Sequence, residues 1–371
     1  MVSSGADTGV ERRRTCGPSA SSWVSPHGRA GPVVHAGRMK IRAIAVAGAA
    51  ALVLAACSGG SKDSGDPEPS QRDAAEIVQP SPLTGLKMQS RPTNPVFVVK
   101  IENTVGGQPQ LALDQADLVV EELVEGGLTR LAAMYYSKIP AKVGHVRSLR
   151  ATDIGIASPI NGVVVASGGA GSAVRLVDRA GIKVFSEDGG APGFSSDPTK
   201  VRPYNRLIDL KTLAAEAAKA PGPEQPFLSW GDEGAAAEPG TSKTSTATTA
   251  SVRFSRSVTT NWKLDGEQKW VRTNGHALKE FRADNLIIMF CPIGDAGYLD
   301  PAGNPVPVTE LEGSGEAYVI RGENVVQLTW KKPAIDSSIS FETADGQPYK
   351  ITPGHSFLEL VPKGDGKVTL K

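Results

Sequence analysis

Apolar and polar positions group into short runs that predict both strands and helices between residues 81 and 230. Several runs are apolar and rich in β-branched residues, as in the central strands of a sheet; they lie at 96–101, 117–124, 128–137 and 162–167. Glu125-Gly126-Gly127 joins two of these runs and is a hairpin signal. Helical pieces fit 152–157, 172–180 and 209–220. We therefore expect an α+β domain with a mixed sheet.

The pattern changes after residue 230. Residues 231–250 combine Gly, Ala and Pro with a Ser/Thr-rich stretch, which is typical of a linker or loop. Beyond them, strand-like runs alternate with Gly, Pro and Asn-Gly turns; the runs lie at 269–272, 285–290, 317–320, 325–330 and 357–361. The predicted fold class is α+β, with a mixed-sheet N-terminal domain at 81–230 and a smaller, mostly β C-terminal domain at 251–371.

The first 80 residues follow a different pattern, that of an export signal and a tether. A basic start precedes an apolar run at 43–53, and small residues lead to the cysteine of Leu54-Ala55-Ala56-Cys57. Because this is the arrangement of a bacterial lipobox, we predict a lipoprotein signal peptide at 39–56 and acylation of Cys57. Residues 57–80 are polar and rich in Pro and Gly, as expected of a flexible tether. Translation is expected to start at Met39, which makes 1–38 a wrongly assigned leader.

Removing the leader and signal changes the charge balance and leaves few cysteines. These segments contain seven basic and two acidic residues, so the formal net charge changes from +1 to −4. That balance argues against nucleic acid as a partner, because a nucleic-acid binder needs a concentrated basic surface. Only Cys291 remains beside Cys57, so no intramolecular disulfide is expected. We expect no cofactor and no metal, since the remaining histidines lack ligand spacing: His145, His276 and His355.

The densest group of charged residues in the first domain lies within the predicted strands and directly after them. Ionic side chains inside apolar strands are costly unless they are paired. A two-residue turn at Gly126-Gly127 would place Arg130 opposite Leu123, within reach of Glu121 or Glu125. We take eight side chains as candidate binding residues: Glu102, Asn103, Glu121, Glu122, Arg130, Arg147, Arg150 and Asp153.

Arg147, Arg150 and Asp153 are spaced three residues apart. On a helical turn they would form one ridge, and the two arginines would offer a fork for a carboxylate or phosphate. The same spacing would equally serve a structural salt-bridge network. A third interpretation is acid–base hydrolysis by Glu121, Glu122 and Asp153, but no G-x-S-x-G, P-loop or H-E-x-x-H motif accompanies them. No catalytic residue is assigned, and the three interpretations stay open.

These motifs resemble the YerB-like lipoproteins, a two-domain bacterial family of uncharacterised biochemical function. The resemblance covers nearly everything from 82 to 362, and rests on 99–103, 113–122, 124–130, 144–153, 313–315, 328–333 and 352–354. Two positions depart from the family pattern: His145 stands where the family tends to have proline, and Tyr204 where it tends to have histidine. The resemblance implies an anchored extracytoplasmic protein and supplies no activity.

The sequence as a whole predicts a lipid-anchored protein on the extracytoplasmic face of the cell membrane. Its expected role is a non-enzymatic binding or regulatory module of the cell envelope, whose partner is a cell-wall glycan or peptide or an envelope protein such as a wall enzyme. One alternative is a cell-wall hydrolase or transferase that uses the clustered carboxylates, with Arg147 and Arg150 as an anion clamp. A second alternative is a solute-binding protein. The ligand, the oligomeric state and the role of the C-terminal domain stay open.

Overall fold

The computed structural model describes residues 79–235, 237–300 and 302–371. The predicted leader, the signal peptide, the acylated Cys57 and the tether up to residue 78 lie outside the described residues. Within the described ranges, no helix is both long enough and apolar enough to cross a membrane.

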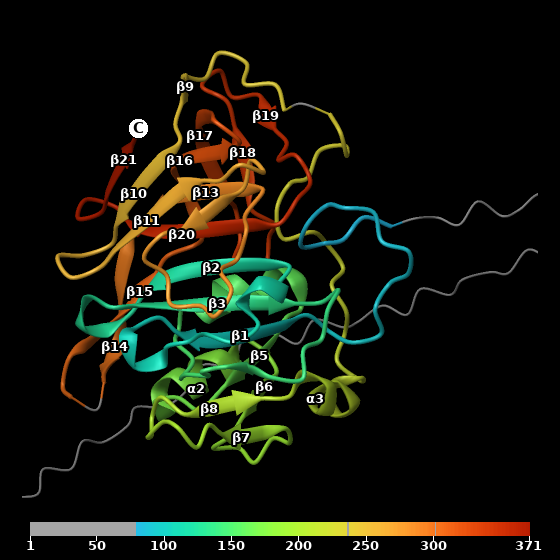
Figure 1. Ribbon diagram of the computed structural model, residues 1–371, viewed down its shortest axis with the longest axis vertical. Coiled ribbons are helices and arrows are strands. Elements are labelled where there is room, and N and C mark those ends of the chain that lie inside the picture. Colours follow the sequence, from blue (N-terminus) through green and yellow to red (C-terminus); the bar gives the residue numbers. More distant parts are fainter. Residues whose placement is uncertain (1–78, 236, 301) are drawn as a thin grey trace, which may run out of the picture. The chain divides into compact units, whose positions relative to one another are not determined.

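Twelve strands of the described chain join into one large sheet that includes strands from both predicted domains (Figure 1). Its order is β19-β18-β17-β16-β13-β20-β2-β3-β1-β5-β6, with β9 also paired to β17. The strands from the first domain are β1 (Phe97–Glu102), β2 (Leu118–Leu123), β3 (Thr129–Tyr135), β5 (Val163–Ala166) and β6 (Val184–Ser186). Those that follow are β9 (Thr244–Thr246), β13 (Asn285–Cys291), β16 (Gly313–Arg321), β17 (Asn324–Lys332), β18 (Ser340–Glu342), β19 (Pro348–Tyr349) and β20 (Ser356–Pro362).

Strand β20 connects the two halves of this sheet. It pairs in parallel with β2 on one side and with β13 on the other. Every residue of β20 is buried, as its apolar run predicts for a strand that is covered on both faces. In Figure 1 the red β20 accordingly lies between the orange β13 and the teal β2. A strand from the C-terminal region therefore extends the sheet of the first domain.

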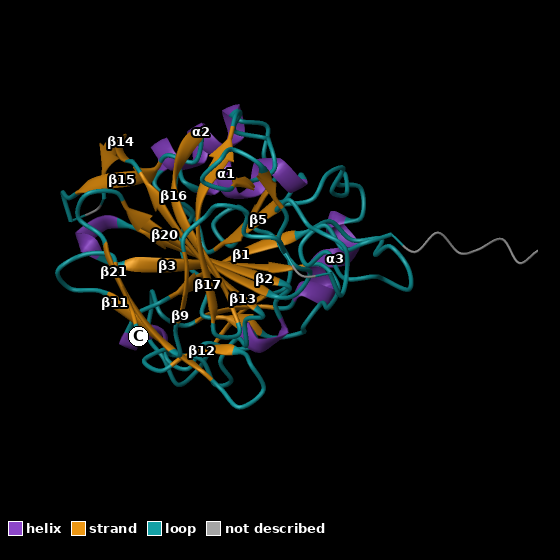
Figure 2. Ribbon diagram, turned by 90° about the horizontal axis from the view of Figure 1, so that it is seen from above, coloured by secondary structure: helices purple, strands orange, loops and turns teal. Residues whose placement is uncertain are grey.

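The described residues contain three short α-helices, α1 (Asp153–Ala157), α2 (Gly171–Arg179) and α3 (Leu210–Ala217). They form at the three predicted helical pieces and lie at the periphery of the strands (Figure 2). Helix α2 links the parallel neighbours β5 and β6. Because helices of five to nine residues contribute little beside the strands, the protein is sheet-rich and not clearly α+β. This corrects the predicted fold class, which gave the helical pieces too much weight.

Three smaller sheets complete the described structure. The first has the order β12-β11-β10-β21, with β10 (Thr249–Arg253), β11 (Thr259–Leu264), β12 (Trp270–Arg272) and β21 (Lys367–Leu370). The others are β4 (Val143–Gly144) with β8 (Arg206–Ile208) and β7 (Phe194–Ser196), and β14 (Ile293–Leu299) with β15 (Pro305–Thr309). The stretch expected as a linker or loop, 231–250, contains β9 and the start of β10, because its Ser/Thr-rich end pairs with β17 and β11.

The two faces of the large sheet bury separate hydrophobic cores. Side chains alternate between faces along a strand, so Val98 and Val120 belong to one core while Val99 and Val119 belong to the other. Each fully buried side chain of this size contributes roughly 1.5–3 kcal/mol. Cys291 is buried in the first core, and burial raises the pKa of its thiol. A buried thiol of this kind is inert, because reactive cysteines are accessible and have a lowered pKa.

The turn between β2 and β3 is one residue longer than the predicted two-residue turn. Residues 125–127 form a 3₁₀ turn whose two glycines both have a φ angle of +69°, a conformation that favours glycine. The register therefore pairs Arg130 with Glu122, where the prediction had placed Leu123. As a result Arg130 shares a face with Glu122, and Glu121 points to the opposite face.

Candidate functional site

The candidate residues divide between the two faces of the large sheet. On one face, side chains of β1, β2 and β3 meet those of the turn after β2 and of the segment before α1. We call this group the ion-pair network: Lys100, Glu102, Glu122, Glu125, Arg130, Arg147, Arg150 and Asp153. The opposite face carries a group that we call the seam cluster: Asn103, Gln110, Glu121, Thr260, Trp262, Arg272 and Glu359.

Lys100, which was not among the eight candidates, lies at the centre of the ion-pair network. Its Nζ is 2.7 Å from Oδ1 of Asp153 and also pairs with Glu122, and all three side chains are fully buried. The backbone N–H of Arg150 donates to the other oxygen of Asp153 at 2.7 Å. Burial opposes the charge on Lys100, but the two carboxylates outweigh it and raise its pKa. Burial also raises the pKa of Glu122.

Glu125, in the turn after β2, is held between two arginines. Arg130 Nη2 lies 3.1 Å from its Oε1, and Nε of Arg150 donates to its Oε2 at 2.7 Å. Although burial opposes ionisation, the hydrogen bond from Arg150 and the charge of Arg130 lower the pKa of Glu125 to about 2. The Arg130–Glu125 contact confirms one of the two predicted pairs. The other, Arg130 with Glu121, is not formed because Glu121 points to the opposite face.

Arg147 and Arg150 do not form the predicted fork. Helix α1 begins only at Asp153, so the segment from 147 to 150 is not a helical turn and its arginines form no common ridge. Nε of Arg147 lies 2.5 Å from Oε2 of Glu102, whereas Arg150 is bound to Glu125. Each arginine therefore contacts a carboxylate of the protein itself.

The network as a whole is closed and electrically balanced. Its four cations face four carboxylates, and every one of these carboxylates lies within ion-pair distance of a cation. Buried charges are tolerated in proteins when they are paired and hydrogen-bonded in this way. This geometry is that of a structural salt-bridge network that ties the segment before α1 to the sheet.

Arg147 is the most exposed member of the network, followed by Glu125. Its side chain is 15% exposed, and its guanidinium lies over the ring of Tyr204 at 5.2 Å from the centroid. The same ring packs on the neighbouring loop, where a Cβ added at Gly106 would come within 2.8 Å of it. Val105 and Val201, from these two loops, are 71% and 77% exposed. We call this area the Arg147 surface, formed by Val105, Arg147, Val201 and Tyr204.

On the other face, the seam cluster lies where the two halves of the sheet pair. Glu121 of β2 and Glu359 of β20 are opposite each other in the parallel register, and both are fully buried. The hydroxyl of Thr260 donates to Glu121 at 3.1 Å, and the indole N–H of Trp262 donates to Glu359 at 2.6 Å. Burial and the charge of Glu121 raise the pKa of Glu359 well above its ordinary value. Burial likewise raises the pKa of Glu121.

Arg272 joins the seam cluster from β12. Its guanidinium donates to the side-chain oxygens of Asn103 at 3.1 Å and of Gln110 at 2.9 Å, and it pairs with Glu280 at 2.9 Å. These first-domain partners lie 169 and 162 positions away in the chain, so no local pattern could reveal the contacts. Sequence reasoning also missed Thr260, Trp262 and Glu359. Glu359 had a usable signal, since it is the one charge in the apolar run at 357–361.

His145, one of the two departures from the family pattern, is fully buried. Its Nδ1 is 2.9 Å from the carbonyl of Gly107, and its Nε2 is 3.0 Å from Oδ2 of Asp197. The two contacts fix the orientation of the imidazole ring. Hydrogen bonds from Thr199 and His145 hold the pKa of Asp197 well below its ordinary value. Within the described ranges, no group of three or more His, Cys, Asp or Glu residues is placed to hold a metal ion.

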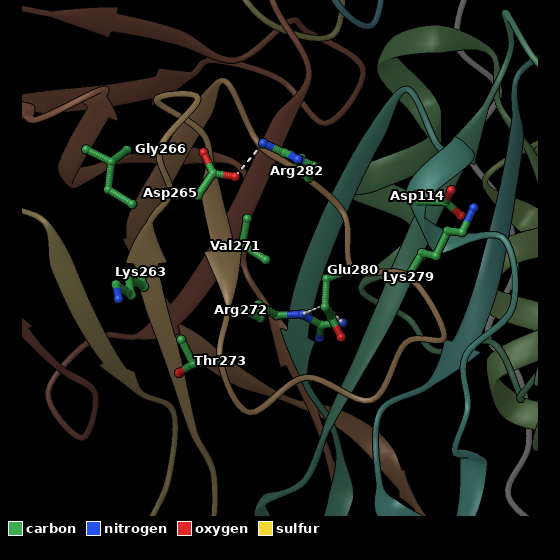
Figure 3. Close-up of a pocket in the computed structure, with 11 residues that line it drawn as sticks. Asp114, Lys263, Asp265, Gly266, Val271, Arg272, Thr273, Lys279, Glu280 and Arg282 are labelled. Atoms are coloured by element: carbon green, nitrogen blue, oxygen red, sulfur yellow. Dashed lines mark hydrogen bonds and ion pairs between the residues drawn. The ribbon is translucent and has the colours of Figure 1, made fainter.

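A surface pocket of about 760 Å³ lies between β11, β12 and the loop at 279–282 (Figure 3). Its charges are largely paired within the protein: Arg282 is 2.5 Å from Asp265, and Arg272 is 2.9 Å from Glu280. Figure 3 shows both ion pairs along the pocket. Through Arg272 the pocket adjoins the seam cluster.

A cleft of about 630 Å³ is formed where the start of the described chain meets the connection after α3. Its lining comes from 79–91 and from 223–232, together with Tyr136 and Lys350. Trp230, which is half-buried, lies in this lining. We call it the Trp230 cleft. No candidate residue of the sequence analysis lines it.

The fold has a counterpart among solved structures. The crystal structure of the YerB protein from Bacillus subtilis is similar with a TM-score of 0.65, over 78% of this chain and 99% of that one, at 21% sequence identity. In sequence, the chain is 39% identical over 90 residues to "Putative lipoprotein YerB" of Bacillus subtilis (strain 168). That alignment spans 24% of this chain and 27% of the relative, about a quarter of the relative's length.

The family comparison covers both regions that the sequence analysis separated. Residues 83–223 match the N-terminal domain, and residues 250–358 the C-terminal domain, of a protein family of unknown function, DUF3048. The ion-pair network lies within the first match, and the seam cluster draws on residues of both. Together these matches confirm the predicted relation to YerB: the chain belongs to the DUF3048 family and has its two-domain architecture.

Proposed function

We propose that the mature protein is a non-enzymatic binding module of the cell envelope, held at the extracytoplasmic face of the membrane by a lipid on Cys57. The lipobox and the similarity to a Bacillus subtilis protein described as a lipoprotein support the anchoring. One observation carries the binding role. Arg147, the most exposed member of the ion-pair network, lies over the ring of Tyr204, and two exposed valines lie in the adjoining loops.

The Arg147 surface has the chemistry of a protein contact. Tyr and Arg are enriched at interface hot spots, and the two exposed valines add apolar area around them. Tyr204 holds the guanidinium of Arg147 in place, which lowers the entropy lost when a partner binds. The partner that fits is an envelope protein, such as a wall enzyme, that offers an apolar contact and an acidic group.

The hydrolase alternative requires two accessible carboxyl groups at about 5–9 Å from each other. Its candidates were Glu121, Glu122 and Asp153, and each of these side chains is fully buried. Their enclosure favours binding over hydrolysis.

Crosslinking in native envelopes, followed by capture of the tethered protein, tests the proposal. A Val105→Ser/Val201→Ser variant keeps the Arg147–Glu102 pair, so it changes the surface without breaking the network. We expect it to recover at least about fivefold less of the partner than the wild type, as for the loss of contacts at an interface hot spot. Arg175→Ala, an exposed arginine on α2, is the matched control and should leave the capture unchanged.

Two results would contradict the proposal. If the double variant and a folded Arg147→Ala variant both capture as much partner as the wild type, the Arg147 surface is not the contact. Release of soluble fragments from purified wall by the wild-type protein would restore the hydrolase alternative.

A further inference from the structure

We infer that the Trp230 cleft binds a neutral glycan. The cleft shares no lining residue with the Arg147 surface, so this is a second site with a different ligand class. This inference rests on the proposed function only for the envelope location, which supplies the glycan. Its volume of about 630 Å³ lies within the range of small-ligand sites, about 300–1,000 Å³.

Trp230 provides a fixed aromatic surface in the cleft. Its indole N–H donates to the carbonyl of Pro82 at 3.2 Å. Gly85 packs against the ring so closely that an added Cβ would lie 2.8 Å from Cγ of Trp230, and its φ of +70° also favours glycine. Because the ring is already held, little side-chain conformational entropy is lost when a ligand packs on it. The apolar C–H face of a sugar ring suits such a surface.

The polar groups around Trp230 favour a neutral, hydroxyl-rich ligand. Three side-chain amides in the lining can donate and accept, as sugar hydroxyls require: Gln79, Gln89 and Gln225. Gln225 already donates one hydrogen bond to the carbonyl of Asp336, which leaves its second N–H and its oxygen. The charged residues of the lining balance, with two of each sign: Arg91 and Lys350 against Glu224 and Asp232. One of these cations is already engaged, because Arg91 donates to the carbonyl of Pro223. An anionic ligand would meet no net positive charge here.

The backbone around the cleft argues against an extended peptide as the ligand. Peptides commonly bind by adding a strand to an open sheet edge. At the base of this cleft, Leu228 and Trp230 already form bridges with Ile339 and Ile351. Recognition at this site therefore has to come from side chains, and these match a glycan.

Acrylamide quenching of tryptophan fluorescence reports directly on this site. Three of the four tryptophans among the described residues are fully buried: Trp262, Trp270 and Trp330. Because Trp230 is only half-buried, it dominates the quenching. The probe is chitotetraose, a neutral oligosaccharide whose acetamido groups can pair with the glutamine amides. We expect chitotetraose to protect the wild-type protein from quenching, with saturation.

Calorimetric titration with the same sugar locates the site. Trp230→Leu should weaken binding at least about tenfold, as for an aromatic hot spot. Gln89→Ala removes only an exposed amide and should weaken binding about two- to tenfold, the range of one hydrogen bond. Gln347→Ala, an exposed glutamine that does not line the cleft, is the control and should bind as the wild type. If Trp230→Leu does not fold, Gln89→Ala still tests the site.

The outcomes that would contradict the inference separate its ligand class from its location. Absence of protection by chitotetraose, or protection by a proline-rich peptide or an acidic glycan instead, would overturn the ligand class. Wild-type affinity in both the folded Trp230→Leu variant and the Gln89→Ala variant would overturn the location. These results are independent of the crosslinking experiment, because a partner captured through the Arg147 surface would remain whether or not the cleft binds sugar.

Discussion

Glu121 and Glu122 show at the residue scale how the environment decides what a carboxylate does. They are neighbours in β2, yet they point to opposite faces of the sheet. Glu122 is paired with the buried ammonium of Lys100, whereas Glu121 faces another acid, Glu359. Burial raises the pKa of both carboxyl groups; the charge of Arg272 counters this at Glu121, and the charge of Lys100 counters it at Glu122. Adjacent carboxyl groups therefore have partners of different kinds, an ammonium for Glu122 and a second carboxyl group for Glu121.

Replacing Glu359 by Gln should remove a pH-dependent loss of stability. The folded state raises the pKa of Glu359 above its ordinary value of 4.5. Between pH 4.5 and the raised pKa, the folded protein therefore binds more protons than the unfolded one. The stability from this group is complete below pH 4.5 and is lost as the pH rises through the folded pKa. The amide needs no proton and can keep the Trp262 hydrogen bond. We expect Glu359→Gln to be more stable than the wild type at pH 7–8, by a margin that grows as the pH rises above 4.5.

Urea unfolding between pH 4.5 and 8 measures this effect. The advantage of Glu359→Gln should shrink toward pH 4.5, where half of the unfolded chains also carry the proton. Glu323→Gln removes a carboxylate from an exposed position and should run parallel to the wild type. The expectation fails if the Glu359→Gln curve is also parallel to the wild-type curve over the whole range.

At the scale of elements, short helices depend on their ends. Asp209 is the N-cap of α3: its Oδ1 accepts from the backbone N–H of Lys211 at 2.9 Å and of Thr212 at 3.3 Å. These are two of the N–H groups that have no partner inside the helix. The buried face of α3, with Leu210 and Leu213, joins the second hydrophobic core. A cap of one residue therefore positions the part of the core that α3 supplies.

Asp209→Ala should cost about 1 kcal/mol of unfolding free energy, the usual cost of losing a helix cap. Asp209→Asn keeps a side-chain oxygen and should lose only a few tenths of a kcal/mol, because Asn is about as good an N-cap as Asp. Chemical denaturation of both variants at neutral pH makes the comparison. Equal stability of the alanine and asparagine variants would show that the cap does not position α3.

At the scale of the whole molecule, β20 makes the folding of the two family domains interdependent. It lies between β2 and β13, and it brings Glu359 into the seam cluster. Without it, the buried strand β2 would be an open sheet edge. An apolar open edge is prone to pair with other chains.

We therefore expect a fragment of residues 79–230 to aggregate when it is produced alone. Production together with a fragment of residues 231–371 should restore a soluble complex, because β20 can then cover β2. Size-exclusion chromatography of both preparations, with intact 79–371 as the control, measures the outcome. A monodisperse fragment 79–230 with cooperative unfolding would show that β20 is not needed to complete the first domain.

Local pattern was enough to locate most of the elements. The apolar runs at 96–101, 285–290 and 357–361 became β1, β13 and β20, and the three helical pieces became α1, α2 and α3. These elements depend on the alternation and type of nearby side chains, which sequence displays directly. The family motifs likewise identified DUF3048, because they are long and local.

What sequence alone determined is therefore the set of strands and helices, the family and the presence of costly charges in apolar strands. Only the tertiary structure decided which partner each charge has. One extra residue in the turn after β2 moved Arg130 opposite Glu122, and the insertion of β20 beside β2 paired Glu121 with Glu359. Neither outcome is local, since a register shift of one residue exchanges the two faces of a strand, and the sheet order joins segments far apart in the chain. The same reason explains why the Trp230 cleft, built from two distant segments, left no pattern in the sequence.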